Sequence, residues 1–208
     1  DLATVDAVDA VTTMREGTLH DFPGVYRVCR LTGHAGRDAT SRHADPDLLG
    51  HLWAGPYLAF PEAVTRVIHD DQGVAGYCLA VPDTAAFEHW LDTVWLPPLR
   101  ERLPLGSGTT EADRALVARI HQTPRSDAAL LAEHPAHLHV DLLPRLQGQG
   151  WGRRIIDDVV GALSREGAPG IHLGVDPGNT AAPGFYQRLG FRPVTGPPGA
   201  RWYGILLA

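Results

Sequence analysis

A glycine turn between a strand pattern and a helix pattern decides the fold of this chain. It reads Gln147-Gly148-Gln149-Gly150-Trp151-Gly152-Arg153-Arg154. Apolar and polar residues alternate from His137 to Leu143 before the turn, which predicts a strand. An amphipathic run from Ile155 to Leu163 after it predicts a helix. A strand that passes through glycines into a helix points backbone N–H groups at one spot, which suits a phosphate.

Several interpretations of this turn compete. A dinucleotide-binding fold needs Gly-x-Gly-x-x-Gly and an acid at the end of the next strand. Asp176 supplies the acid, but the spacing here is Gly148-x-Gly150-x-Gly152, and only one further strand–helix unit follows. A P-loop is excluded because no Lys-Ser/Thr pair follows the glycines. A purely structural turn that needs small residues stays open.

The other patterns give an α/β protein with a mixed sheet. The 208 residues fit a single domain, 1–208, in which we expect residues 1–10 to form a loose tail. The expected order is β-α-α-β-β-insert-β-α-β-α-β-β. Its elements are a strand over 11–18, a helix after Asp21, a short helix after Asp47, a hairpin over 63–81, a helical insert over 82–135, a strand over 137–143, a helix over 152–164, a strand over 171–175, a helix over 180–189, and two short strands near Phe191 and over 202–207.

Charge and cysteine content narrow the class of protein. The formal net charge of −6 argues against sequence-independent binding of nucleic acid or of an anionic membrane. No apolar run is long enough to span a bilayer, and there is no signal-peptide pattern. Cys29 and Cys78 lie in apolar-periodic segments, as small buried hydrophobes do. We therefore expect a cytoplasmic protein in a reducing compartment.

A second motif follows the glycine turn and identifies a family. The segment Asn179-Thr180-Ala181-Ala182-Pro183-Gly184-Phe185-Tyr186-Gln187-Arg188-Leu189-Gly190-Phe191 resembles the Asn-x-x-Ala-x-x-(Phe/Leu)-Tyr-x-x-x-Gly-Phe helix of the GCN5-related N-acetyltransferases (GNAT). Gln147-x-x-Gly150-x-Gly152 is similar to that family's (Gln/Arg)-x-x-Gly-x-(Gly/Ala) signature. Both motifs occur in the family's order.

Further segments narrow the resemblance to the C-terminal acetyltransferase-like domain of O-GlcNAcase. They are Val25 to Cys29, Pro46 to Gly50, Gly76 to Ala80, and Trp95 to Pro98. The animal domains have lost the glycine signature, whereas this chain keeps it and so resembles a stand-alone bacterial relative. The resemblance implies a GNAT fold: a central mixed, mostly antiparallel twisted sheet with helices on both faces and a splayed strand pair that holds the cofactor.

The resemblance also implies acetyl-coenzyme A as cofactor and acetyl donor, and assigns residues to it. In this family the pantetheine arm of the donor inserts like an extra strand beside the strand that precedes the glycines. The implied cofactor-binding residues are Val140, Asp141, Leu142, Gln147, Gly148, Gln149, Gly150, Trp151, Gly152, Arg153, Asn179 and Tyr186. For Arg153 and its neighbour Arg154 a solvated helix face is an equal interpretation, and for Asn179 a helix cap is one.

Tyr186 matches the position of the family's general acid for the coenzyme A thiolate, and a core tyrosine is the competing interpretation. The general base is harder to place because Gly174 stands where many relatives carry glutamate. Asp141 or His139, on the polar face of the predicted strand, is the leading candidate, and Asp176 the third.

The implied reaction is transfer of acetyl to a primary amine by direct attack in a ternary complex. The alternative is a non-catalytic acyl-coenzyme A-binding or protein-interaction domain. No metal is expected, because His134, His137 and His139 have no cysteine or fourth ligand at a fixed spacing. We expect the acceptor site to involve residues 53–57 and the insert 82–135 with its tryptophans. The amine-bearing acceptor is not specified by the sequence, and a homodimer is compatible with the fold.

Overall fold

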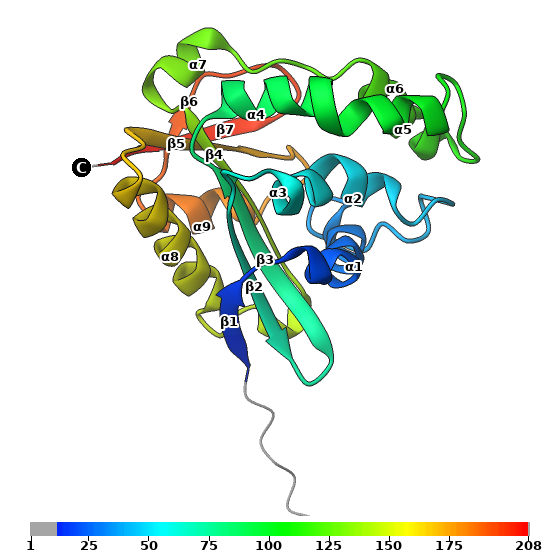
Figure 1. Ribbon diagram of the computed structural model, residues 1–208. Coiled ribbons are helices and arrows are strands. Elements are labelled where there is room, and N and C mark those ends of the chain that lie inside the picture. The colour runs from blue at the N-terminus through cyan, green and yellow to red at the C-terminus, as the bar shows by residue number, and fades with distance from the viewer. Residues whose placement is uncertain (1–11, 208) are drawn as a thin grey trace, which may run out of the picture.

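The computed structural model describes residues 12–207 and consists of one twisted sheet between two groups of helices (Figure 1). The sheet order is β1-β2-β3-β4-β5-β7-β6. Its strands are β1 (Thr13–Glu16), β2 (Val64–Asp70), β3 (Gly73–Val81), β4 (Ala136–Leu142), β5 (Gly170–Val175), β6 (Arg192–Val194) and β7 (Arg201–Leu206). The mixed α/β fold predicted from the sequence is therefore confirmed.

Helices cover both faces of the sheet. On one face lie α1 (Phe22–Thr32), α2 (Leu48–Trp53) and α3 (Gly55–Ala59), and on the other lie α8 (Trp151–Arg165) and α9 (Ala182–Arg188) (Figure 1). The insert contains α4 (Thr84–Trp90), a π-helical turn (Leu91–Trp95), α5 (Leu96–Arg102), α6 (Glu111–His121) and α7 (Ala128–Glu133). The chain also forms 3₁₀ turns at Leu19–Asp21 and Pro144–Leu146.

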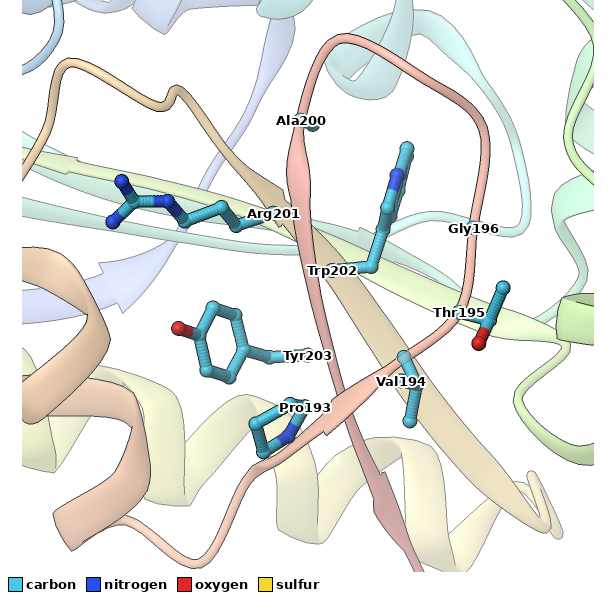
Figure 2. A pocket seen from close by; sticks show the side chains of 8 residues that line it. All are labelled: Pro193, Val194, Thr195, Gly196, Ala200, Arg201, Trp202 and Tyr203. Atoms are coloured by element: carbon cyan, nitrogen blue, oxygen red, sulfur yellow. The ribbon is translucent and has the colours of Figure 1, made fainter.

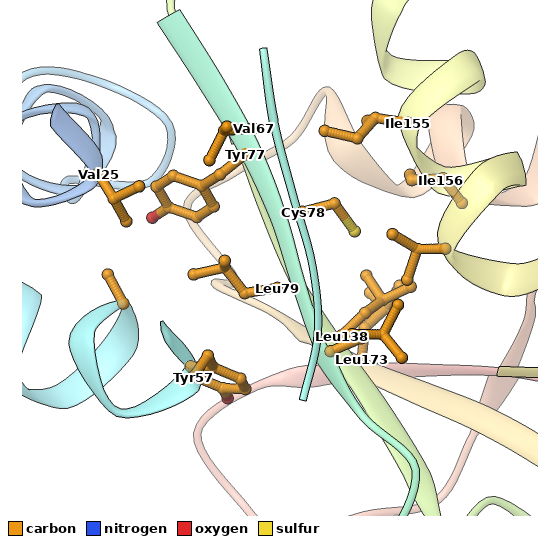
Figure 3. Packing of buried hydrophobic residues seen from close by; sticks show 14 of the residues in the cluster. Val25, Tyr57, Val67, Tyr77, Cys78, Leu79, Leu138, Ile155, Ile156 and Leu173 are labelled. Atoms are coloured by element: carbon orange, nitrogen blue, oxygen red, sulfur yellow. The ribbon is translucent and has the colours of Figure 1, made fainter. Parts of the chain in front are cut away.

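The two faces of the central strands form two halves of the core because side chains alternate along a strand. Tyr77 and Leu79 of β3 point toward α1 and α3, whereas Cys78 points toward α8 (Figure 3). Leu138 of β4 lies on the α8 side with Ile155 (Figure 3). We call these surfaces the α1 face and the α8 face.

One strand junction is open. All neighbouring strands pair in antiparallel fashion except β4 and β5, which are parallel. That pair is joined only by Ala136 with Ile171 and His137 with His172. Beyond His137 the two strands diverge, while β4 remains paired to β3 as far as Leu142. We call the gap between the diverging strands the wedge; it is the splayed strand pair that the family resemblance implied.

Most predicted elements occur within a few residues of their expected bounds, but two helices were missed. The first strand is shorter than predicted, and the expected tail at residues 1–10 lies outside the described residues. Sequence analysis missed α3 and α7, helices of five and six residues. Helices this short lack the two full turns that a periodic pattern needs. Among residues 12–207, no helix has the length and apolar character to cross a membrane.

Candidate functional site

The glycine turn leaves backbone N–H groups free at the wide end of the wedge. Gly148 and Gly150 have φ angles of +73° and +83°, and a side chain at either would meet nothing within 4 Å. Within the described part of the chain, no backbone carbonyl accepts from the N–H groups of residues 148–150. The first N–H groups of α8, a helix of 15 residues, follow directly. The turn therefore presents a row of donors and a helix N-terminus to open space, as a phosphate site requires.

Side chains of the turn fasten it to its surroundings. Gln147 donates from Nε2 to the Leu142 carbonyl at 3.0 Å, so it ties the turn to the end of β4. Gln149 donates to the Arg145 carbonyl at 2.6 Å. These two glutamines therefore hold the turn through its side chains and leave its backbone N–H groups available.

The two arginines after the turn are held by neighbours on the surface. The Arg153 guanidinium donates to the Arg188 carbonyl at 3.2 Å, at the C-terminal end of α9. The Arg154 guanidinium lies 5.1 Å from the ring centre of Trp151. Both positive charges lie beside the phosphate-type turn, although each also has a partner within the protein.

The register of β4 decides which of its backbone groups face the wedge. The Leu143 N–H donates to the Ala75 carbonyl across the β3 side. Because N–H and C=O directions alternate along a strand, the groups of Leu142 and Val140 point to the wedge, and those of Asp141 point to β3. The backbone groups of β4 available to a ligand are therefore those of Val140 and the N–H of Leu142, since the Leu142 carbonyl already accepts from Gln147. Asp141 faces the site through its side chain.

His139 and Asp141 form a pair on the α1 face. His139 Nε2 lies 3.1 Å from Asp141 Oδ2, and their side chains are 31 % and 19 % exposed. The Tyr77 hydroxyl donates to the same carboxylate oxygen at 2.6 Å. A carboxylate only accepts, so His139 donates from Nε2, and in the neutral ring Nδ1 is then the accepting nitrogen. That nitrogen has no hydrogen-bond partner among residues 12–207, which leaves it available to accept a proton.

Tyr186 approaches from the opposite face. It lies on α9, is 8 % exposed, and packs against Phe185, Phe191 and Tyr203. Burial raises the pKa of its phenol, and the negative charge of Asp141 raises it further. The hydroxyl therefore stays protonated, and Asp141 is near enough to act on it. Both the acid and the core interpretations of this tyrosine are compatible with that environment.

His137 shares a strand face with His139 but has a structural role. Its Nδ1 lies 2.7 Å from the Thr84 hydroxyl, and its Nε2 lies 2.7 Å from the Tyr57 hydroxyl. Thr84 gives its one proton to the Pro135 carbonyl, so it accepts from His137 Nδ1, and Tyr57 donates to Nε2. Burial lowers the pKa of His137 strongly. Within residues 12–207, no three His, Cys, Asp or Glu residues cluster as metal ligands would.

The remaining candidates lie at the β5 side of the wedge. Asn179 accepts from the Ala182 N–H at 3.2 Å and so binds the first N–H of α9, whose N-cap residue is Ala181. A side chain at Gly36, in the loop after α1, would come within 3.3 Å of the Asn179 amide nitrogen. Asp176 is exposed and accepts from the Gly178 N–H at 2.7 Å. Both residues thus shape the loop between β5 and α9.

Trp202 would crowd a side chain at Gly174. A Cβ at Gly174 would lie 3.2 Å from the indole of Trp202 on the neighbouring strand β7. The indole donates to the Pro197 carbonyl at 2.7 Å, so the β6–β7 loop holds it in place. Trp202 and Tyr203 point to opposite sides of β7 (Figure 2). A shallow hollow of about 390 Å³ lies along this hairpin, and none of the predicted site residues lines it.

The aromatic residues of the insert pack mainly against one another. Trp90 stacks with Trp95 at 6.0 Å between ring centres and contacts Phe60 at 5.3 Å. The Trp95 indole donates to the His51 carbonyl at 2.9 Å. These contacts join the insert to α2 and α3, so most of this aromatic surface is structural.

Comparison with known proteins gives the family. The model of the acetyltransferase (GNAT) family matches residues 36–191, so this chain belongs to that family. Membership supports acetyl-coenzyme A-dependent acetyl transfer in general and an acyltransferase fold.

Particular relatives extend this result. The structure called SsHAT is 32 % identical, with a TM-score of 0.82 over 95 % of this chain and 98 % of that one. Rat protein O-GlcNAcase is 23 % identical over 86 % of this chain, which spans only 20 % of that protein's length. A phosphinothricin acetyltransferase from Sinorhizobium meliloti, solved in complex with acetyl-coenzyme A, is 14 % identical, with a TM-score of 0.52 over 95 % of this chain and 89 % of that one. This last likeness shows the fold alone.

The structure brings most of the predicted residues to one wedge. The glycine turn lies at its wide end, His139 and Asp141 on its α1 face, and Tyr186 on its α8 face. Tyr77 was not among the predicted site residues, because the sequence does not show that its hydroxyl reaches a neighbouring strand. The available signal was a tyrosine within the otherwise apolar run Val74 to Val81.

Proposed function

We propose that this chain transfers acetyl from acetyl-coenzyme A to a primary amine by direct attack in a ternary complex. The observation that carries the proposal is the wedge, which has a candidate base on one face and a candidate acid on the other. His139 and Asp141 belong to the α1 face, and Tyr186 comes from the helix layer of the α8 face. A donor arm in the wedge would lie between them.

The chain's own groups fit acetyl-coenzyme A. The free N–H groups of residues 148–153 suit its pyrophosphate, and the backbone groups of Val140 with the N–H of Leu142 suit an extended amide-bearing arm. Because Gly148 and Gly150 have open space where side chains would be, a phosphate can approach the backbone closely. When bound, the cofactor supplies an activated acetyl thioester.

In the proposed reaction His139 accepts a proton from the amine at Nδ1, and Asp141 stabilises the resulting imidazolium through Nε2–H. The neutral amine nitrogen then forms the new bond to the acetyl carbon. The Leu142 N–H is placed to stabilise negative charge on the acetyl oxygen. Tyr186 gives its hydroxyl proton to the departing thiolate, and the second proton, which the nitrogen loses once it has bonded to the acetyl carbon, returns to the Tyr186 phenolate, so the protons and the leaving group balance. Cys29 and Cys78 are free thiols that form no disulfide bond, which suits our expectation of a reducing cytoplasm.

Calorimetry and an amine panel test this function. We expect acetyl-coenzyme A to bind at micromolar concentration, and one member of a panel of lysine peptide, glucosamine and spermidine to be acetylated. His139→Gln should lower kcat by about 10²- to 10⁴-fold and leave acetyl-coenzyme A binding unchanged, because the ring lies outside the phosphate site. A wild-type protein that shows no binding heat with acetyl-coenzyme A would refute the proposal.

A non-catalytic domain that binds an acyl-coenzyme A or another protein is the second candidate. The specific observation in its favour is Gly174, which has no side chain where many relatives carry glutamate and where Trp202 would crowd one. Binding of acetyl-coenzyme A with no turnover of any amine, or with a slow turnover that His139→Gln leaves unchanged, would favour it. The rat O-GlcNAcase relative does not specify an acceptor, because this chain spans only 20 % of that protein.

A further inference from the structure

Tyr77 is the least exposed member of the polar group on the α1 face. It lies in the middle of β3, is 0 % exposed, and has its ring beside Val25 and Val67 (Figure 3). A phenylalanine would fill almost the same space among these apolar side chains. Packing therefore does not require the Tyr77 hydroxyl, and its role follows from the group to which it donates a hydrogen bond.

The hydroxyl acts on Asp141. It donates to Oδ2 at 2.6 Å, and His139 Nε2 lies 3.1 Å from the same oxygen. One carboxylate oxygen thus receives two donors, while Oδ1 has no hydrogen-bond partner within the described chain. With Oδ2 fixed by Tyr77, the carboxylate cannot rotate away from His139 without leaving a buried hydroxyl unpaired, which is costly.

Tyr77 also acts on His139 directly. The two rings are stacked, with centroids 5.9 Å apart and an interplanar angle of 27°. The tyrosine ring limits rotation of the imidazole on one side, and Asp141 holds its Nε2. His139 is thereby held with Nδ1 directed away from both contacts.

The surroundings of the Tyr77 hydroxyl keep it protonated. Burial raises the pKa of Tyr77 and that of Cys29 on α1, and the negative charge of Asp141 raises both further. The Tyr77 phenol therefore keeps the proton that it donates to Asp141.

We propose that Tyr77 is the positioning residue of this site, because its hydroxyl holds the Asp141 carboxylate and its ring holds the His139 imidazole. The contribution to catalysis rests on the proposed function, whereas the positioning itself is a property of the free protein. Tyr77 touches no reacting atom and acts through its two neighbours.

The test is proton NMR of the full chain in the absence of ligand. The His139 Nε2–H proton, assigned by its absence in His139→Gln, should give a resolved imidazole resonance. In Tyr77→Phe we expect that resonance to broaden or disappear, because a free carboxylate no longer shields the proton from exchange with water. Tyr26→Phe is the matched control: the Tyr26 hydroxyl lies 2.9 Å from His51 Nδ1, and within the described chain it makes no hydrogen bond to His139 or Asp141. It should leave the His139 resonance unchanged.

Activity provides the second readout. Against the amine found in the panel, Tyr77→Phe should lower kcat by about 10- to 100-fold, the range typical of residues that orient a functional side chain. The KM for acetyl-coenzyme A should stay unchanged, and Tyr26→Phe should have wild-type kcat. If Tyr77→Phe does not fold, Asp141→Ala provides the same information, because it should abolish both the His139 resonance and a slowly exchanging Tyr77 hydroxyl resonance.

The outcomes separate the two proposals. An unchanged His139 resonance in Tyr77→Phe, or an equal loss in Tyr26→Phe, overturns the positioning role. If Tyr77→Phe does not fold, the positioning role is overturned when the His139 resonance or the Tyr77 hydroxyl resonance persists in Asp141→Ala. A wild-type protein that does not bind acetyl-coenzyme A overturns the proposed function, and the resonance of the free protein still decides the role of Tyr77.

Discussion

At the scale of single residues, one experiment can decide whether Tyr186 acts through its hydroxyl or only packs through its ring. It reaches the wedge from the α8 face, and burial keeps its hydroxyl protonated by raising its pKa. No hydrogen bond holds this hydroxyl among the described residues, whereas the ring has three aromatic neighbours. Ring and hydroxyl can therefore be tested separately.

We predict that Tyr186→Phe lowers kcat by about 10²- to 10³-fold with little change in stability. The ring contacts are kept, and the proton for the leaving thiolate is lost. The measurement is steady-state kinetics with thermal unfolding in parallel. Wild-type kcat in this variant would mean that Tyr186 serves only as core packing.

His137 and His139 show what a residue pattern cannot reveal. Both lie on the same predicted strand face, and the sequence does not show what surrounds either ring. In the structure His137 is enclosed by Tyr57 and Thr84 from two other elements, and both of its nitrogens are occupied. His139, two residues on, lies where β5 has diverged and keeps one nitrogen free. The difference comes from tertiary contacts, which local spacing does not encode.

At the scale of elements, the glycine turn and the wedge act as one unit. The turn was predictable because its glycines need positive φ angles, which is a local requirement readable from residue type. The donors that it presents were predictable for the same reason. The direction of the β4 backbone groups was not, because it depends on the register with β3, and that register is fixed by packing across the whole sheet.

We predict that Gly150→Ala weakens acetyl-coenzyme A binding by about tenfold or more. The φ angle of +83° is strained for alanine by about 1–2 kcal/mol, so the turn relaxes and its N–H groups lose their common direction. The comparison is isothermal titration of this variant with wild type.

Gly73→Ala is the matched control for this element. Gly73 has a φ angle of +93° and equally open surroundings, but it begins β3 at the hairpin with β2. We expect the same loss of stability and no loss of affinity. Equal weakening of binding by both substitutions would show that general destabilisation, and not the geometry of the turn, controls affinity.

At the scale of the whole molecule, one buried and two partly buried histidines set how stability depends on pH. Burial lowers the pKa of His137, of His172 and of His51, and the positive charge of Arg102 adds to the effect at His51. In the unfolded chain, histidines have pKa values of about 6.5 and take up protons near that pH. In the folded protein these three histidines are still neutral there, because their pKa values are lower. The stabilisation from these groups is fully present above about pH 6.5 and is lost as the pH falls toward their folded values.

We predict that the free energy of unfolding decreases from pH 7 to pH 5, by up to about 1.4 kcal/mol per pH unit for each of these histidines. The measurement is urea unfolding at fixed ionic strength across that range. His137→Gln supplies the control, since an amide can donate to Thr84 and accept from Tyr57 as the neutral ring does, but takes up no proton. Its slope should therefore be smaller than that of wild type. A stability that rises on acidification, or an identical slope in His137→Gln, would contradict the claim that buried neutral histidines control this dependence.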